Sequence, residues 1–203
     1  VQAIRDLITD LIPRQGFDPV REVQVLCPMV RGEVGTRHLN QVLQQLINPP
    51  NGSKPELTRG GTTLRVGDRV MQQTNDYNRE VFNGDLGRIV AIDTDDQEVA
   101  VQFGERLVTY DYADLNEISL AWAISIHKSQ GSEYPVVILP TYMQHYLLLS
   151  RNLIYTGLTR ARKLAIFVGP QKAIGFAVRQ VKDQQRYTLL TQRLAQACGI
   201  TSL

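Results

Sequence analysis

The chain has 203 residues, 43% of them hydrophobic and 21% charged, which is typical of a globular protein with ample material for a core. Its formal net charge of +2 excludes a strongly basic protein, so any surface for nucleic acid must be local rather than global. No apolar run approaches the length of a membrane helix and no signal peptide opens the chain, so neither membrane insertion nor secretion is predicted.

The two cysteines, Cys27 and Cys198, are far apart and lack the spacing of metal ligands. Unclustered thiols fit a reducing compartment better than a disulfide scaffold, so we predict a cytoplasmic protein without a metal site in this chain. The chain opens with Val1 rather than methionine, inside a segment with a helical pattern, and we expect it to be a piece of a longer protein.

Helix and strand patterns alternate at the start of the chain. Apolar residues recur at helical spacing over residues 2–12, which predicts an amphipathic helix that ends at Pro13. Alternation over residues 22–27 predicts a strand. A glycine-containing loop follows, and Thr36 is placed to cap a second helix.

The pattern changes at residues 48–55, where three prolines and a glycine break any regular element. Short apolar runs and tight turns then alternate from residue 62 to residue 117, with the last strand expected at residues 107–112. Five short strands within about 55 residues predict a small barrel.

Longer elements return in the last third. The apolar runs at 136–139 and 165–168 fit buried parallel strands, whereas residues 152–161 and the tail 172–198 fit helices. We therefore predict an α/β domain with a parallel sheet, interrupted by a small all-β barrel. The expected bounds are 1–60 and 118–203 for the α/β domain and 61–117 for the barrel.

The first chemically informative segment is Cys27-Pro28-Met29-Val30-Arg31-Gly32-Glu33-Val34-Gly35-Thr36, between a predicted strand and a predicted helix. Ligands bind α/β sheets at such places. The Arg31 guanidinium could form forked hydrogen bonds with a phosphate, and Gly35-Thr36 at a helix N-terminus offers donors to an anion. The alternative is a solvated loop arginine and a helix cap.

Ser125-Ile126-His127-Lys128-Ser129-Gln130-Gly131-Ser132-Glu133 concentrates hydroxyl, imidazole, ammonium and amide groups ahead of an apolar strand. Such donors can contact phosphate, and Gly131 has no side chain to block a close approach of the backbone. The alternative is a strand end that turns into a capped helix.

Tyr155-Thr156-Gly157-Leu158-Thr159-Arg160-Ala161-Arg162 places two arginines within three residues. In phosphoryl transfer, an arginine from a neighbouring domain stabilises the charge that develops on the transferred phosphate. The alternative is an amphipathic helix whose arginines face solvent.

These three segments, in this order, resemble the fourth, fifth and sixth motifs of superfamily 1 helicases of the RecD-like branch, the exonuclease V α-subunit type. The resemblance covers nearly the whole chain, and residues 67–87 are similar to the SH3-like barrel inserted in the second motor domain of these proteins. It implies a RecA-like second lobe of the P-loop NTPase fold, part of an ATP-driven DNA helicase with 5′-to-3′ polarity in DNA repair and recombination.

The resemblance also implies residue roles. Arg160 would be the arginine finger and Arg31 a second cationic ligand of the γ-phosphate. Gln130, Gly131 and Glu133 would contact the nucleotide. A further set would contact single-stranded DNA, namely Ser125, His127 and Thr36.

No sequence of the form GxxxxGK[ST] occurs in the chain, so ATP with Mg²⁺ would be held mainly by an N-terminal motor domain of the same polypeptide. The isolated chain would then hydrolyse essentially no ATP. Single-stranded DNA and other exonuclease V subunits are the remaining implied partners. Two alternatives stay open: the helicase portion of a conjugative relaxase, and a non-catalytic nucleic-acid-binding module.

Several barrel residues have two interpretations. The aromatic side chains could stack on bases or fill the barrel core: Tyr77, Phe82, Phe103, Tyr110 and Tyr112. Arg69, Arg79 and Arg88 could follow a phosphate backbone or simply keep the surface soluble. A solvated helical face is the expectation for Lys172, Arg179, Lys182 and Arg186.

Overall fold

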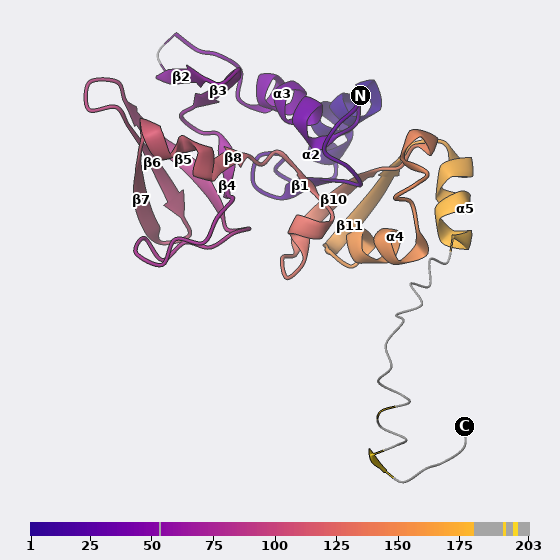
Figure 1. The fold of residues 1–203 in the computed structure, drawn as a ribbon. Coiled ribbons are helices and arrows are strands. Elements are labelled where there is room, and N and C mark those ends of the chain that lie inside the picture. The colour runs from indigo at the N-terminus through magenta and orange to yellow at the C-terminus, as the bar shows by residue number, and fades with distance from the viewer. Residues whose placement is uncertain (53, 181–192, 194–196, 199–203) are drawn as a thin grey trace.

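The computed structural model describes residues 1–52, 54–180, 193, 197 and 198 (Figure 1). Four parallel strands form its first sheet, in the order β11-β10-β1-β9. Their bounds are Val23–Cys27 for β1, Ala123–Ser125 for β9, Tyr134–Pro140 for β10 and Ala161–Val168 for β11. The predicted α/β class with an all-β insert is confirmed.

Helices cover both faces of this sheet, which explains why its central strands are apolar on both sides. The N-terminal helical segment and α3 (Thr36–Ile47) pack with Val25 and Ile138 in one hydrophobic cluster. Leu153 of α4 (Arg151–Leu158) packs with Val137 and Leu139 in another. Alternate residues of one strand therefore face opposite layers.

The N-terminal helical segment extends past its predicted end. It consists of α1 (Gln2–Asp6), a π-helical turn η1 (Leu7–Leu11) and α2 (Ile12–Arg14), so Pro13 lies inside it. The prediction that the helix ends at Pro13 was wrong. Pro13 stands in the first turn of the last helical piece, where a missing N–H costs little.

The cap of α3 also differs from the prediction. Gly35 occupies the N-cap position, Thr36 is the first helical residue, and no side chain caps the helix. A Cβ at Gly35 would lie 2.4 Å from the carbonyl oxygen of Arg31 and 2.6 Å from that of Val30. The loop returns so closely onto its own backbone that only glycine fits at position 35. The N-cap is therefore Gly35 and not Thr36, the residue that was expected to cap the helix.

The all-β insert contains a hairpin and a five-stranded antiparallel sheet in the order β7-β6-β5-β4-β8. The hairpin strands are β2 (Glu56–Arg59) and β3 (Thr62–Arg65). The sheet strands are β4 (Arg69–Gln72), β5 (Leu86–Asp93), β6 (Glu98–Phe103), β7 (Arg106–Asp111) and β8 (Ile118–Leu120). The insert thus covers residues 56–120, and a 3₁₀ turn, η2 (Tyr112–Glu117), precedes β8.

Arg69 joins the insert to the parallel sheet. Its guanidinium donates to the carbonyl oxygens of Val20 (2.5 Å) and Val23 (2.8 Å) and to Oε1 of Gln24 (3.0 Å). Burial, with a smaller contribution from the nearby Arg88, lowers the pKa of Arg69 to about 10. The arginine therefore belongs to the interior of the junction.

The C-terminal part returns to helix and strand. The helix predicted at 152–161 is shorter in the structure: α4 ends at Leu158, and β11 begins at Ala161. Two short 3₁₀ turns, η3 (His127–Ser129) and η4 (Met143–His145), flank β10, and α5 is Gln171–Arg179. Most of the predicted helical tail beyond residue 180 lies outside the described residues. Within the described part, no helix is long and apolar enough to cross a bilayer.

Candidate functional site

Arg160 lies in the turn between α4 and β11, not on the face of a helix. Its Nη1 donates to the carbonyl oxygen of Ser132 (3.1 Å) and its Nε to that of Thr156 (3.3 Å). Nη2 donates to Oγ1 of Thr159 (3.3 Å). These contacts place the guanidinium against the end of the 125–133 segment.

The charge of Arg160 is not neutralised within the described part of the chain, where no carboxylate lies within 4.0 Å of its guanidinium. The neighbouring carboxylate, Glu133, instead accepts from Nε of Arg162 at 2.8 Å. A half-buried guanidinium held only by neutral oxygens has unused capacity for an anion.

The residues predicted to contact nucleotide flank Ser132 in the chain, whose carbonyl oxygen accepts from Arg160. Gly131 has φ +86°, a left-handed conformation that favours glycine, and no atom lies within 4 Å of where a Cβ would be. Gln130 is exposed and its side chain has no hydrogen bond among the described residues. The open space at Gly131, the free amide of Gln130 and the unneutralised guanidinium of Arg160 are features that could form one wall of a site for the phosphates of a nucleotide.

Arg31 is placed elsewhere. It is exposed in the loop that follows the carboxyl end of β1, whereas Arg160 precedes the amino end of β11. Because the strands are parallel, these two positions lie at opposite ends of the strands. The structure therefore does not bring Arg31 and Arg160 together around one point.

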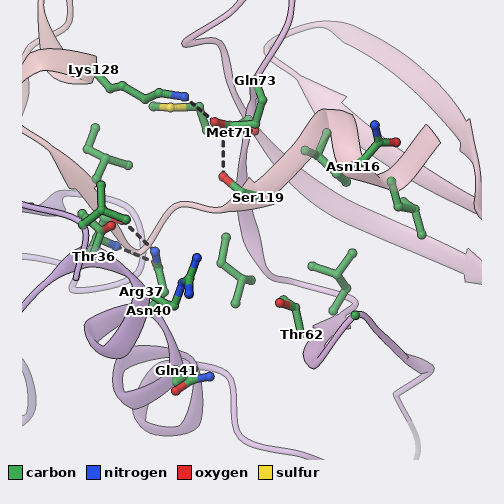
Figure 2. Close-up of a pocket in the computed structure, with 18 of the residues that line it drawn as sticks. Thr36, Arg37, Asn40, Gln41, Thr62, Met71, Gln73, Asn116, Ser119 and Lys128 are labelled. Carbon is green, nitrogen blue, oxygen red and sulfur yellow. Dashed lines mark hydrogen bonds between the residues drawn. The ribbon is translucent and has the colours of Figure 1, made fainter. Parts of the chain in front are cut away.

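A cavity of about 630 Å³ lies between the all-β insert and the α/β part (Figure 2). Its walls come from α3, β9 and η3 on one side and from the β2–β3 hairpin, β4 and β8 on the other. Among the described residues, three cationic side chains line it, Arg37, Arg59 and Lys128, and no acidic residue does. In a chain with 22 basic and 20 acidic residues, this is a local excess of positive charge.

Two of the three residues predicted to bind DNA, Thr36 and Ser125, line this cavity. Amide and hydroxyl groups from both walls, including Asn40 and Ser119, add polar contacts (Figure 2). The third, His127, is exposed and does not line it, and its side chain makes no hydrogen bond among the described residues. The parallel pairing of β1 with β9 places Ser125 next to Cys27, where the loop that leads to Thr36 begins.

The barrel residues divide between core and surface. Phe103 and Tyr110 are buried, while Tyr77 and Phe82 are exposed and pack edge to face with ring centroids 5.8 Å apart. The three barrel arginines all make contacts within the chain. Arg79 pairs with three carboxylates and Arg88 donates to Gly67 and Val20. Arg69 is half-buried at the junction, so none of the three is the free surface cation that either interpretation expected.

The cationic residues of the cavity were not singled out from the sequence. Arg37 and Lys128 stand next to Thr36 and His127, so the motif segments contained a signal for them. Arg59 carried none, because only the folded hairpin brings it to the cavity. Of the basic residues predicted on the tail, Lys172 and Arg179 are exposed on α5, and Lys182 and Arg186 lie outside the described residues. In the part of the chain that the structure describes, no cluster of three or more His, Cys, Asp or Glu residues could hold a metal ion.

Comparison with known proteins matches two family models. Residues 39–103 match the SH3 domain of ATP-dependent RecD-like DNA helicases, and residues 120–168 match the UvrD-like helicase C-terminal domain. The ATP-dependent RecD2 DNA helicase of Deinococcus radiodurans is 38% identical over 168 residues, which is 83% of this chain and 23% of that protein. The RecBCD enzyme subunit RecD of Haemophilus influenzae is 36% identical over 80% of this chain and 24% of that protein.

The chain thus spans about a quarter of the length of these curated relatives. Among solved structures, a Bacteroides Pif1 helicase in complex with ADP-AlF3 and single-stranded DNA matches with a TM-score of 0.58 at 20% identity. That match covers 98% of this chain and 51% of the other, and it supports the RecA-like fold. The motif order, the fold and these relatives agree, and the chain belongs to the RecD-like superfamily 1 DNA helicases.

Proposed function

We propose that this chain forms one wall of the nucleotide site and part of the single-stranded DNA track of an ATP-driven helicase. The observation that carries the proposal is the environment of Arg160. Its guanidinium contacts the 125–133 segment and has no carboxylate partner in the described part of the chain. The same segment begins at the cavity that Arg37, Arg59 and Lys128 make positive.

On the nucleotide side, ATP with Mg²⁺ supplies the phosphoryl group that is transferred to water. Arg160 stabilises the charge that develops on the phosphate oxygens, which a planar guanidinium does better than an ammonium. Gly131 allows the backbone to approach the phosphates, and Gln130 offers an amide. Glu133 keeps its ion pair with Arg162 and so holds the turn that presents the glycine. Arg31 would reach the γ-phosphate only after a movement of its loop.

On the DNA side, Ser125 and Thr36 contact phosphates within the cavity, and His127 extends the contact onto the exposed surface. Ser125 and Gly131 belong to one short segment, so a movement driven at the nucleotide end is passed directly to the DNA contacts. Repeated closure and opening against another lobe would then move the strand, and the family resemblance gives the 5′-to-3′ direction.

The other half of the nucleotide site is assigned to an N-terminal motor domain, which contributes the P-loop lysine and a Mg²⁺-binding carboxylate. The 203-residue chain alone is therefore expected to hydrolyse essentially no ATP. Other exonuclease V subunits are candidate partners, because several relatives are named as RecBCD subunits.

The test is the substitution Arg160→Lys in the full-length protein. An arginine finger contributes about 10³-fold or more to the rate, so the DNA-stimulated ATPase kcat should fall by at least about 10²-fold even though the charge is kept. Affinity for single-stranded DNA should stay within about threefold of wild type, because Arg160 lies away from the cavity. The matched control is Arg179→Lys, an exposed arginine on α5, which should leave both quantities unchanged.

Retention of ATPase activity in Arg160→Lys would remove the arginine from the catalytic machinery. Absence of ATPase activity in the wild-type full-length protein, with binding to single-stranded DNA retained, would favour a binding module in which the motor motifs have no role. Loss of both ATPase and DNA affinity would contradict the separation of the two sites.

A further inference from the structure

A side-chain bridge joins the all-β insert to the 125–133 segment across the cavity. The ammonium of Lys128 donates to Oε1 of Gln73, which directly follows β4. Nε2 of Gln73 donates in turn to Oγ of Ser119 on β8 (2.7 Å) and to the carbonyl oxygen of Met71 (3.0 Å). Figure 2 shows Lys128 reaching from the opposite wall of the cavity toward Gln73.

The orientation of the Gln73 amide is determined by these contacts. The carbonyl of Met71 can only accept, so the NH₂ group must face it, and the amide oxygen must then face Lys128. A flipped amide would bring two oxygens together on one side and two donors together on the other. The backbone N–H of Gln73 also donates to the carbonyl oxygen of Glu117 at 2.6 Å, which holds the backbone of Gln73 in place.

Lys128 is the charged member of the bridge, and it lacks a neutralising partner. No carboxylate of the described residues lies within 4.0 Å of its ammonium, and its pKa is lowered because burial removes water from the charge. Its backbone N–H donates to Oγ of Ser125 at 3.3 Å, within the segment assigned to DNA. An ammonium has three donors, so the bond to Gln73 leaves two for an anion.

We propose that Lys128 binds a backbone phosphate of single-stranded DNA in this cavity, and that Gln73 of the insert is a positioning residue that aims the ammonium at it. The inference rests on the proposed function, since it assumes that the cavity holds the strand. By this inference the all-β insert contributes to DNA binding by the helicase. The insert sets the DNA affinity of the α/β part by orienting one of its cations.

The experiment is a double-mutant cycle in the full-length protein, with oligo(dT) as the probe and affinity measured over a range of salt concentrations. Lys128→Met should weaken binding and make the slope of log affinity against log salt shallower by about 0.7, the value for one phosphate contact on a single strand. Gln73→Leu should weaken binding about three- to tenfold at low salt, because the ammonium loses its orientation. In the Lys128→Met background, Gln73→Leu should have no further effect.

Two controls match these variants. Lys172→Met removes an exposed lysine on α5, and Gln102→Leu removes a glutamine of the insert whose side chain, among the described residues, donates only to the carbonyl oxygen of the nearby Gly104. Neither should alter affinity or slope. Ser119→Ala is a milder version of the Gln73 substitution, because it removes one of the two acceptors that fix the amide, and its effect should also vanish without Lys128. Melting temperatures of all variants separate these effects from loss of the fold.

The outcomes distinguish the inference from the function on which it rests. If Lys128→Met weakens binding but Gln73→Leu does not, or if the two effects add, the positioning role is overturned while the DNA track stands. If Lys128→Met leaves both affinity and slope unchanged, phosphate binding at this lysine is overturned. If the wild-type protein does not bind oligo(dT), both the inference and the proposed function fail.

Discussion

At the scale of single residues, glycines determine the geometry of both candidate sites, and for different reasons. Gly131 has a left-handed backbone and open space beside it, so only its conformation requires glycine. Gly35 has an ordinary φ of −82°, but its missing side chain lets the loop carrying Arg31 return onto its own backbone. The first kind of glycine can be inferred from a turn pattern, whereas the second depends on a packing contact.

Gly35→Ala is predicted to destabilise the chain by about 1–3 kcal/mol, the usual cost of forcing an extra methyl group into a filled space. The new Cβ would meet the backbone of Arg31 at 2.4 Å, and a backbone cannot move aside as a side-chain end can. Urea unfolding of the 203-residue chain measures the effect. Gly52→Ala is the control, because nothing lies within 4 Å of its Cβ position, and it should stay within about 0.5 kcal/mol of wild type. Equal stability of the two variants would contradict the steric argument.

The sequence indicated candidate site residues but not the partners of their side chains. The order of Ser125, Gly131 and Arg160 along the chain was enough to predict two linked sites. The partners of the polar side chains could not be predicted, because Lys128 reaches Gln73 across 55 positions and Arg160 reaches Ser132 across 28. Such pairs depend on how sheets are assembled, which local periodicity does not encode.

At the scale of elements, a buried carboxylate joins α3 to the β2–β3 hairpin. Asp68 is fully buried and accepts from Nε2 of Gln44 (2.5 Å), Nδ2 of Asn48 (2.8 Å) and the backbone N–H of Arg65 (2.8 Å). Burial raises the pKa of the Asp68 carboxyl above its usual value, and the hydrogen bonds from these three donors offset part of that rise. Three donors converging on two carboxylate oxygens require an acceptor-only side chain.

Asp68→Asn should therefore destabilise the chain by about 1–3 kcal/mol, since its NH₂ group would face a donor and leave buried groups unpaired. The size of the side chain is unchanged, so packing does not contribute to the difference. Equilibrium unfolding in urea gives the value. Asp95→Asn, at an exposed turn between β5 and β6, is the matched control and should be nearly neutral. An Asp68→Asn variant as stable as this control would mean that the network does not hold the two elements together.

Most elements were predictable because their periodicity is local. The buried strands β1, β10 and β11 and the helix α3 were all expected near their observed places. The misses have physical causes: Pro13 stands in the first turn of the last helical piece, so the helix continues past it, and the parallel strand β11 begins at Ala161, soon after α4 ends. The hairpin β2–β3 was missed because its strands are short and largely exposed, so they show no apolar alternation.

At the scale of the whole molecule, the all-β insert and the α/β part share one hydrophobic core. Val25 and Ile138 of the parallel sheet belong to the same buried cluster as Ile89 and Tyr110 of the insert. Arg69 adds hydrogen bonds across the junction, and Trp122, the single tryptophan of the chain, is buried there with the Arg69 guanidinium 5.5 Å from its ring centroid. An insert with its own separate core would have left this junction polar.

A shared core predicts that the 203-residue chain unfolds in one cooperative transition. Fluorescence of Trp122, which reports the junction, and far-UV circular dichroism, which reports all helices and strands, should give the same urea midpoint. Ile89→Val in the insert and Ile138→Val in the parallel sheet, both fully buried, should each cost about 1 kcal/mol and lower both signals together. If Ile89→Val shifted only one signal, or if the wild type showed two transitions, the insert would be an independent unit. The Lys128–Gln73 bridge would then connect two bodies free to move apart, because no common core would hold the cavity walls in place.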